Sequence, residues 1–83
     1  MEEKAIIILI LHKRNYQTDL EIPLNVSANE FVAALNAAYD LGIDTTDVKN
    51  CYLKAENPIA LIRGNKTLME FGVRNGTIIH FTE

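Results

Sequence analysis

The chain has 83 residues, of which 48% are hydrophobic and 23% charged, and its 8 basic and 11 acidic residues give a formal net charge of −3. This length leaves no room for a second core, and the chain is too apolar for disorder driven by charge. It also lacks the basic stripe of a nucleic-acid-binding protein. A single cysteine, Cys51, excludes an internal disulfide, and no secretory signal is recognisable. We expect one domain over residues 1–83 in a reducing cytoplasm.

The N-terminal third predicts two strands. Residues 5–11 are seven consecutive apolar residues, rich in β-branched isoleucine, which favours an extended backbone. A membrane-spanning helix needs about twenty, so we predict a central strand over residues 4–11 and a turn over residues 12–15. Leu20, Ile22 and Leu24 then alternate with other residues, as in a half-buried strand. Pro23 has no N–H to donate, which favours a sheet edge.

One helix follows, and three shorter strands come after it. Ser27 and Glu30 have the spacing of a capping box, in which the serine hydroxyl accepts a backbone N–H and the glutamate reaches back to the serine amide. Phe31, Leu35 and Ala38 follow at helical spacing, and Gly42 is a candidate helix end. Alternating or short apolar segments predict strands over residues 51–56, 59–62 and 77–81.

This order of elements predicts an α+β fold in which one helix covers one face of a mixed sheet. We expect the first and last strands to lie parallel in its middle. The first strand is apolar on both faces, whereas a strand with one solvated face alternates. We therefore expect the second face of the sheet to be covered or contacted by another surface.

The end of the chain resembles the close of a ubiquitin-like β-grasp domain. It has a Gly64-Asn65 turn, a cluster of Leu68, Phe71 and Val73, a second turn over residues 75–76 and an apolar strand. Ubiquitin-type modifiers continue into a Gly-Gly tail, but this sequence ends in Thr82-Glu83. We therefore expect a protein that is not conjugated to others.

Nearly the whole chain resembles the small ubiquitin-like proteins of Gram-positive type VII (ESX-type) secretion loci, the YukD/EsaB group. The resemblance rests on the apolar first strand, on residues 16–23 leading into the helix, and on residues 68–79. It implies a cytoplasmic accessory or regulatory protein that acts by protein contact, docks on the cytosolic side of the secretion machinery and does not insert into the membrane.

The same resemblance implies which side chains face the helix, namely Ile6, Ile8, Ile10, Ile79 and Phe81. The candidate protein-contact surface is the outward set: Ile7, Leu9, Tyr52, Lys54, Ile78 and His80. Ile7, Leu9 and Leu11 are more apolar than the polar or acidic residues expected at the alternate positions of this family's first strand. On this parity Leu9→Asp abolishes binding and leaves the fold intact, whereas unfolding would mean the opposite parity.

No residues stand at catalytic or metal-binding spacing, so we expect neither an enzyme nor a cofactor. His12 and His80 are far apart, and Cys51 is interpreted as a core side chain. Four basic residues lie in the C-terminal half, namely Lys54, Arg63, Lys66 and Arg74. We interpret them as scattered charge, and the alternative is that they bind an acidic partner.

Two other functions remain open. The first is a β-grasp adaptor or homodimer that uses the same apolar face and is unrelated to secretion. The second is a modifier or sulfur carrier activated by processing, which requires a Gly-Gly sequence that the chain does not contain.

Overall fold

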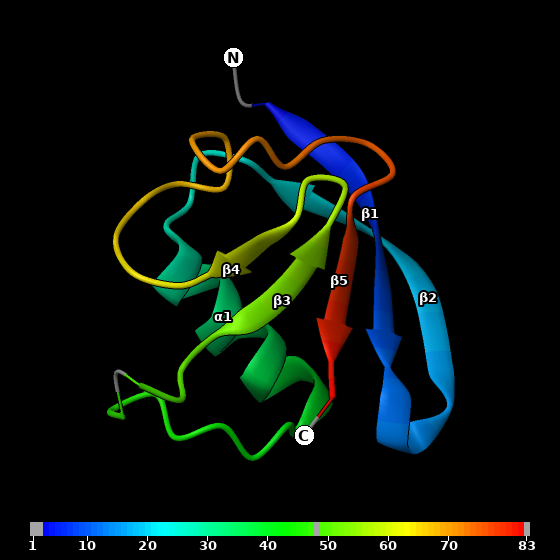
Figure 1. The fold of residues 1–83 in the computed structure, drawn as a ribbon, viewed down its shortest axis with the longest axis vertical. Helices are drawn as coiled ribbons and strands as arrows, with labels where there is room; N and C mark the ends of the chain where they lie inside the picture. Colours follow the sequence, from blue (N-terminus) through cyan, green and yellow to red (C-terminus); the bar gives the residue numbers. More distant parts are fainter. Residues whose placement is uncertain (1–2, 48, 83) are drawn as a thin grey trace.

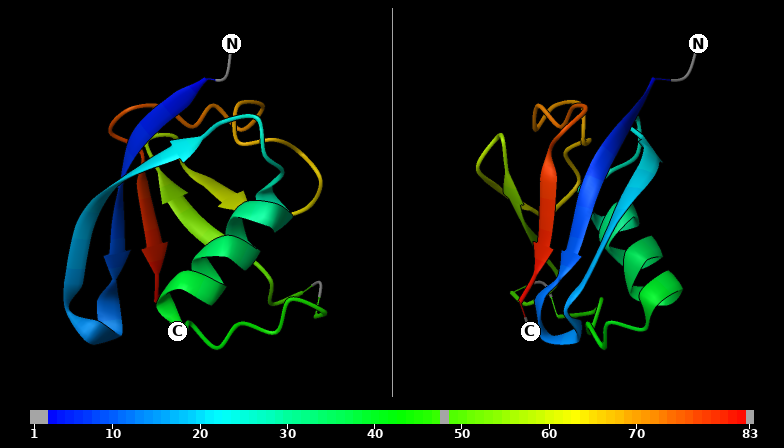
Figure 2. Two further views of the ribbon diagram at one scale, coloured as in Figure 1. Left: turned by 180° about the vertical axis from the view of Figure 1, so that it is seen from behind. Right: turned by 90° about the vertical axis from the view of Figure 1, so that its right-hand side faces the viewer.

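The computed structural model describes residues 3–47 and 49–82. Glu83, which stands in the predicted place of a Gly-Gly tail, lies outside the described residues. Five strands form one sheet, and a single helix lies against one of its faces (Figures 1 and 2). The elements in chain order are β1 (Lys4–Leu11), a 3-10 turn η1 (His12–Arg14), β2 (Tyr16–Pro23), α1 (Ala28–Tyr39), β3 (Leu53–Glu56), β4 (Ala60–Ile62) and β5 (Ile78–Phe81). The predicted α+β class is confirmed.

The sheet has the strand order β2-β1-β5-β3-β4. β1 and β5 are parallel and lie next to each other, as predicted, while the other neighbouring strands are antiparallel. β2 is an edge strand, and Pro23 is its last residue, which agrees with the interpretation of that proline. Because the helix covers only one face, the other face of β1 and β5 is left without a covering element (Figure 2).

The predicted parity of β1 is wrong. Ile7 and Leu9 are fully buried, with exposed fractions of 0%, whereas Ile6 is 51% exposed. The side chains of a strand alternate between the two faces, so an error of one residue inverts every assignment. Since β1 is apolar on both faces, its sequence pattern does not indicate which set faces the helix.

The parity of β5 is as predicted, since Ile79 is fully buried and Ile78 faces outward, half-buried. Phe81 is half-buried and packs against the core. Cys51 is buried, as expected of a core side chain. The largest fully buried hydrophobic side chains form the centre of the core: Ile7, Leu9, Leu11, Val32, Leu53, Ile62, Leu68 and Ile79.

The helix begins as the capping box predicts, and ends earlier than expected. The Ser27 Oγ accepts the Glu30 N–H at 3.1 Å, but the Ser27 hydroxyl, not its amide, donates to Glu30 Oε1. The helix ends at Tyr39, with Asp40 rather than Gly42 in the left-handed cap position at φ 52°. The side chain of Asn36 bonds both the N–H and the carbonyl of Ile43 at 2.9 Å, which holds the following chain outside the helix.

Replacing the cap residue gives a first test of the local structure. Ser27→Ala removes the acceptor of the Glu30 N–H, and we expect it to lower the free energy of unfolding by about 1 kcal/mol. Ser27→Thr keeps a hydroxyl that can accept the Glu30 N–H and donate to Glu30 Oε1, and it is expected to remain close to the unmodified protein. Urea unfolding of both variants measures the difference; equal losses would mean that the cap contributes nothing specific.

Within residues 3–47 and 49–82, no helix is long and apolar enough to cross a membrane.

Candidate protein-contact surface

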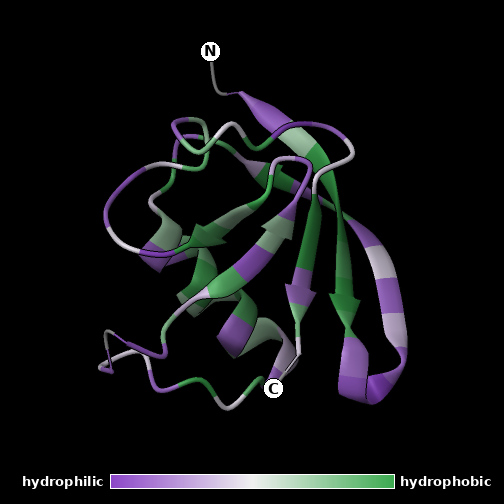
Figure 3. Cartoon of the chain, viewed as in Figure 1, coloured by the Kyte–Doolittle hydropathy of each residue, from purple (hydrophilic) through white to green (hydrophobic). Residues whose placement is uncertain are grey.

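The uncovered face of the sheet carries a line of isoleucines. Ile6, Ile8 and Ile10 face outward from β1, and Ile78 of β5 lies directly beside Ile8. Ile6 is 51% exposed, and the other three side chains are half-buried. Figure 3 shows hydrophobic colouring along most of β1 and along β5 apart from one hydrophilic band. We refer to Ile6, Ile8, Ile10 and Ile78 as the isoleucine stripe.

Polar and charged side chains border the isoleucine stripe on both sides. On the β2 side, Glu21 is paired with Ile6 and Asp19 with Ile8. On the β3 side, Glu56 is paired with Ile78, and Lys54 with His80. Residues directly opposite each other in a sheet share a face, so these charges lie around the apolar stripe. Three carboxylates against one lysine make the border mainly acidic.

Two histidines meet at one end of the stripe. His12 Nε2 lies 2.7 Å from His80 Nδ1, the rings are stacked at 5.0 Å, and His80 Nε2 lies 2.7 Å from Glu56 Oε1. Which atom donates and which accepts in each contact depends on the tautomers of the two rings. The parallel pairing of β1 and β5 brings the two histidines together. Because they are 68 residues apart in the sequence, their spacing does not predict the contact.

The contacts with His12 and Glu56 orient His80 on the uncovered face. Among residues 3–47 and 49–82, no group of three or more histidine, cysteine or carboxylate residues is placed to hold a metal ion.

Four of the six predicted contact residues lie on the uncovered face. Lys54 is exposed, while Tyr52, Ile78 and His80 are half-buried. Tyr52, Lys54 and His80 line one shallow groove of about 190 Å³. The two others, Ile7 and Leu9, are removed from the candidate surface because they are buried. Sequence reasoning missed Ile6, Ile8 and Ile10, which take their place.

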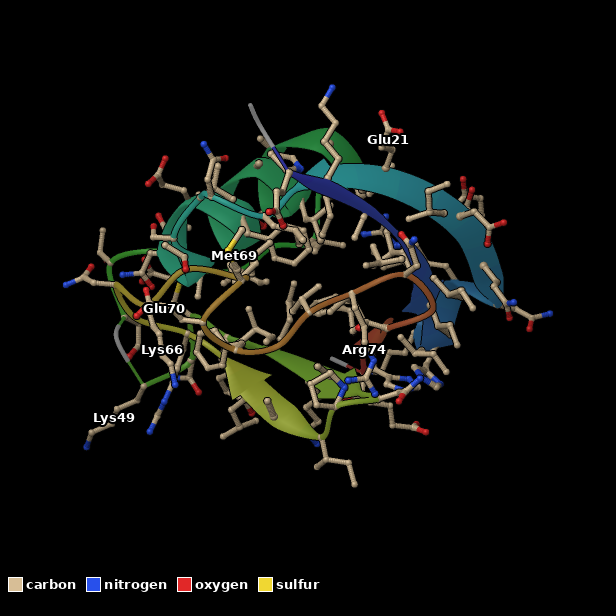
Figure 4. All side chains as sticks on the ribbon, turned by 90° about the horizontal axis from the view of Figure 1, so that it is seen from above. Glu21, Lys49, Lys66, Met69, Glu70 and Arg74 are labelled. Carbon is tan, nitrogen blue, oxygen red and sulfur yellow. The ribbon has the colours of Figure 1, made fainter. Side chains whose placement is uncertain are left out.

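The loop before β5 is held by local hydrogen bonds between Thr67 and Glu70. The Glu70 carboxylate accepts the N–H and the hydroxyl of Thr67, both at 3.0 Å, and these bonds hold the pKa of Glu70 below its ordinary value. Lys66 lies over the Phe71 ring, 5.0 Å from its centroid. Figure 4 shows Lys66 and Arg74 well apart, so these basic residues do not form one patch.

Comparisons with known proteins identify a family and, separately, a fold. The model of a family described as "WXG100 protein secretion system (Wss), protein YukD" matches residues 6–81. The solution structure of a ubiquitin-like domain from tubulin-binding cofactor B is similar, with a TM-score of 0.74 and 20% identity over 96% of this chain and 89% of that chain. This likeness shows the ubiquitin-like β-grasp fold. A search of curated proteins gives no match.

Proposed function

Because the chain belongs to the YukD family of the WXG100 protein secretion system, as its sequence resemblance predicted, we propose that it is an accessory or regulatory protein of that system. It acts by binding another protein of the secretion machinery and not by catalysis, as a single domain in the cytoplasm. The observation that supports binding is the isoleucine stripe on the face that the helix does not cover.

The stripe and its acidic border describe the expected partner surface. Covering a fully exposed isoleucine contributes about 1.5–3 kcal/mol, and the stripe residues contribute less because they are already partly buried. Association must also offset the loss of rigid-body freedom. The partner is therefore expected to add charged contacts, with an apolar centre facing the stripe and basic side chains facing Asp19, Glu21 and Glu56.

Ile8→Lys tests this function in cells. The lysine faces outward beside Asp19, with which it can pair, so the fold is expected to survive. A charge in the centre of the stripe is expected to weaken partner binding about tenfold or more. In a strain lacking the gene, complementation with Ile8→Lys is expected to restore little of the secretion of WXG100 proteins into the medium.

The matched control is Met69→Lys. Met69 is 44% exposed in the loop between β4 and β5 and belongs neither to the stripe nor to its border, so this variant is expected to restore secretion fully. Normal secretion by Ile8→Lys would contradict the proposal. A concentration-dependent dimer that Ile8→Lys abolishes, without any effect on secretion, would support a homodimerisation module instead.

A further inference from the structure

A second apolar surface lies on a different side of the molecule, between the edge strand β2 and the helix. A groove of about 410 Å³ runs between them. Leu20 and Ile22 of β2 form one side, and Phe31, Ala34 and Ala38 of α1 form the other. Ala34 and Ala38 are one helical turn apart, and both are exposed. Because these alanines are small, the groove has room for side chains from outside.

Contacts from the β1–β2 turn hold one end of the groove. The Arg14 guanidinium donates to the carbonyl of Tyr39 and, at 2.6 Å, to the carbonyl of Asp40, at the C-terminal end of α1. The rings of Tyr16 and Tyr39 lie 6.1 Å apart across the same end. These contacts join the strand to the helix and fix the width of the groove at this end.

The backbone of β2 offers hydrogen bonds along this groove. The Leu24 N–H bonds to the Glu3 carbonyl at 2.9 Å, and bonded pairs alternate with non-bonded pairs in an antiparallel ladder. With the register of β1 and β2, this alternation turns the N–H and carbonyl groups of Gln17, Asp19 and Glu21 away from β1. They lie on the open edge of the sheet, because β2 has no second neighbour among the described strands. An edge of this kind is a template for an added strand.

Charge at the edge restricts which strand fits. The side chains of Asp19 and Glu21 are exposed, and Glu30 of the helix also lines the groove. Figure 4 shows Glu21 projecting from β2 beside the helix. An added strand places its alternate side chains opposite those of β2. Basic residues at these positions are therefore favoured, while the intervening side chains point into the apolar groove.

We propose that β2 and α1 form a docking site for an extended segment of another protein, which adds to the sheet as a strand. The segment alternates aliphatic residues, seated between β2 and α1, with lysine or arginine residues placed beside Asp19 and Glu21. This site adjoins the isoleucine stripe and shares Asp19 and Glu21 with its acidic border, but its groove lies between β2 and α1, and the proposal does not depend on the proposed function.

A second copy of this chain is a poorer occupant. In an antiparallel pair, two residues directly opposite each other either both bond across the pair or both do not. Of the registers that satisfy this rule, those with the greatest overlap between two β2 edges are centred on Asp19 or on Leu20. Either register sets a carboxylate of one copy directly opposite a carboxylate of the other, and like charges in that position are destabilising. Charge complementarity therefore favours a basic segment over self-pairing.

The test uses the full chain and synthetic peptides of about seven residues, the length of one strand. One peptide alternates lysine and valine, a second has the same composition without the alternation, and a third alternates glutamate and valine. Binding is followed by NMR, through the hydrogen exchange of single backbone amides. We expect the first peptide to slow exchange at Asp19 and Glu21 by about tenfold or more. The other two peptides are expected to have little effect.

Matched helix variants locate the peptide. Ala34→Gln with Ala38→Gln fills the groove and is expected to weaken binding about tenfold. Ala33→Gln with Ala37→Gln makes the same exchange at exposed alanines that do not line the groove, so affinity is expected to change less than about twofold. Glutamine is a good helix former, so both double variants are expected to fold. Ile78→Lys changes the stripe beside Glu56, away from Asp19 and Glu21, and is expected to bind the peptide normally.

The proposal is overturned if the alternating basic peptide leaves the Asp19 and Glu21 amides unprotected, or if both alanine pairs respond alike. It is also overturned if the acidic or non-alternating peptide binds equally well. Protection that rises with protein concentration in the absence of peptide would assign the edge to a second copy and overturn the proposed occupant.

Discussion

Leu9→Asp is expected to unfold the protein. Leu9 is fully buried on β1 and faces the helix and the core. Removing a buried leucine side chain costs about 2–5 kcal/mol, and a carboxylate buried without a partner costs several kcal/mol more. A domain of this size has a total stability of about 5–10 kcal/mol, so the substitution removes most or all of it. Circular dichroism and the dispersion of the NMR spectrum measure the outcome.

Ile10→Asp is the matched control on the adjacent residue. Ile10 faces outward, and its neighbours across the sheet are Gln17 and His80, neither of which carries a negative charge. The same new carboxylate is therefore expected to leave the fold intact. If Leu9→Asp folded while Ile10→Asp did not, the parity of β1 described above would be wrong.

Thr77→Val is expected to destabilise the protein by about 1–3 kcal/mol, because it leaves two partly buried backbone groups without their hydrogen-bond partners. Thr77 has an exposed fraction of 0%. Its hydroxyl donates to the Asn57 carbonyl at 2.8 Å and accepts the Arg74 N–H at 3.0 Å. Valine has nearly the same shape, so the loss comes from the hydrogen bonds and not from a cavity. Urea unfolding measures the change, with an unaltered m-value as the sign that both states are otherwise the same.

Thr77→Ser separates the two contributions. Serine keeps the hydroxyl and loses one methyl group, which is worth about 0.8 kcal/mol. It is therefore expected to be clearly more stable than Thr77→Val. A valine variant as stable as the unmodified protein would show that water satisfies the Asn57 and Arg74 backbone groups.

Most of the fold follows from local patterns. The bounds of β1, the edge position marked by Pro23 and the helix start at Ser27 were all predicted, because each depends on neighbouring residues. The end of the helix was predicted less well. Gly42 was the obvious candidate, but the bonds between the Asn36 side chain and Ile43 stop the helix at Tyr39. Such a side-chain contact leaves no periodic signal in the sequence.

The candidate site was only partly predictable. Tyr52, Lys54, Ile78 and His80 lie on the uncovered face because β3 and β5 alternate in the ordinary way. Ile7 and Leu9 were predicted to face outward, although Ile6, Ile8 and Ile10 do so. Seven consecutive apolar residues carry no period of two that could indicate the outward set. The His12–His80 contact and the groove beside α1 depend on strand pairing and on the packing of the helix against β2.

The sequence by itself determined the elements, the α+β class and the membership of the YukD family, because these follow from residue patterns along the chain. The tertiary structure alone decided which isoleucines reach solvent, which histidines meet and where the sheet keeps an open edge. These features depend on register and on which face the helix covers. A continuous apolar strand satisfies either register equally well until the other strands and the helix are in place.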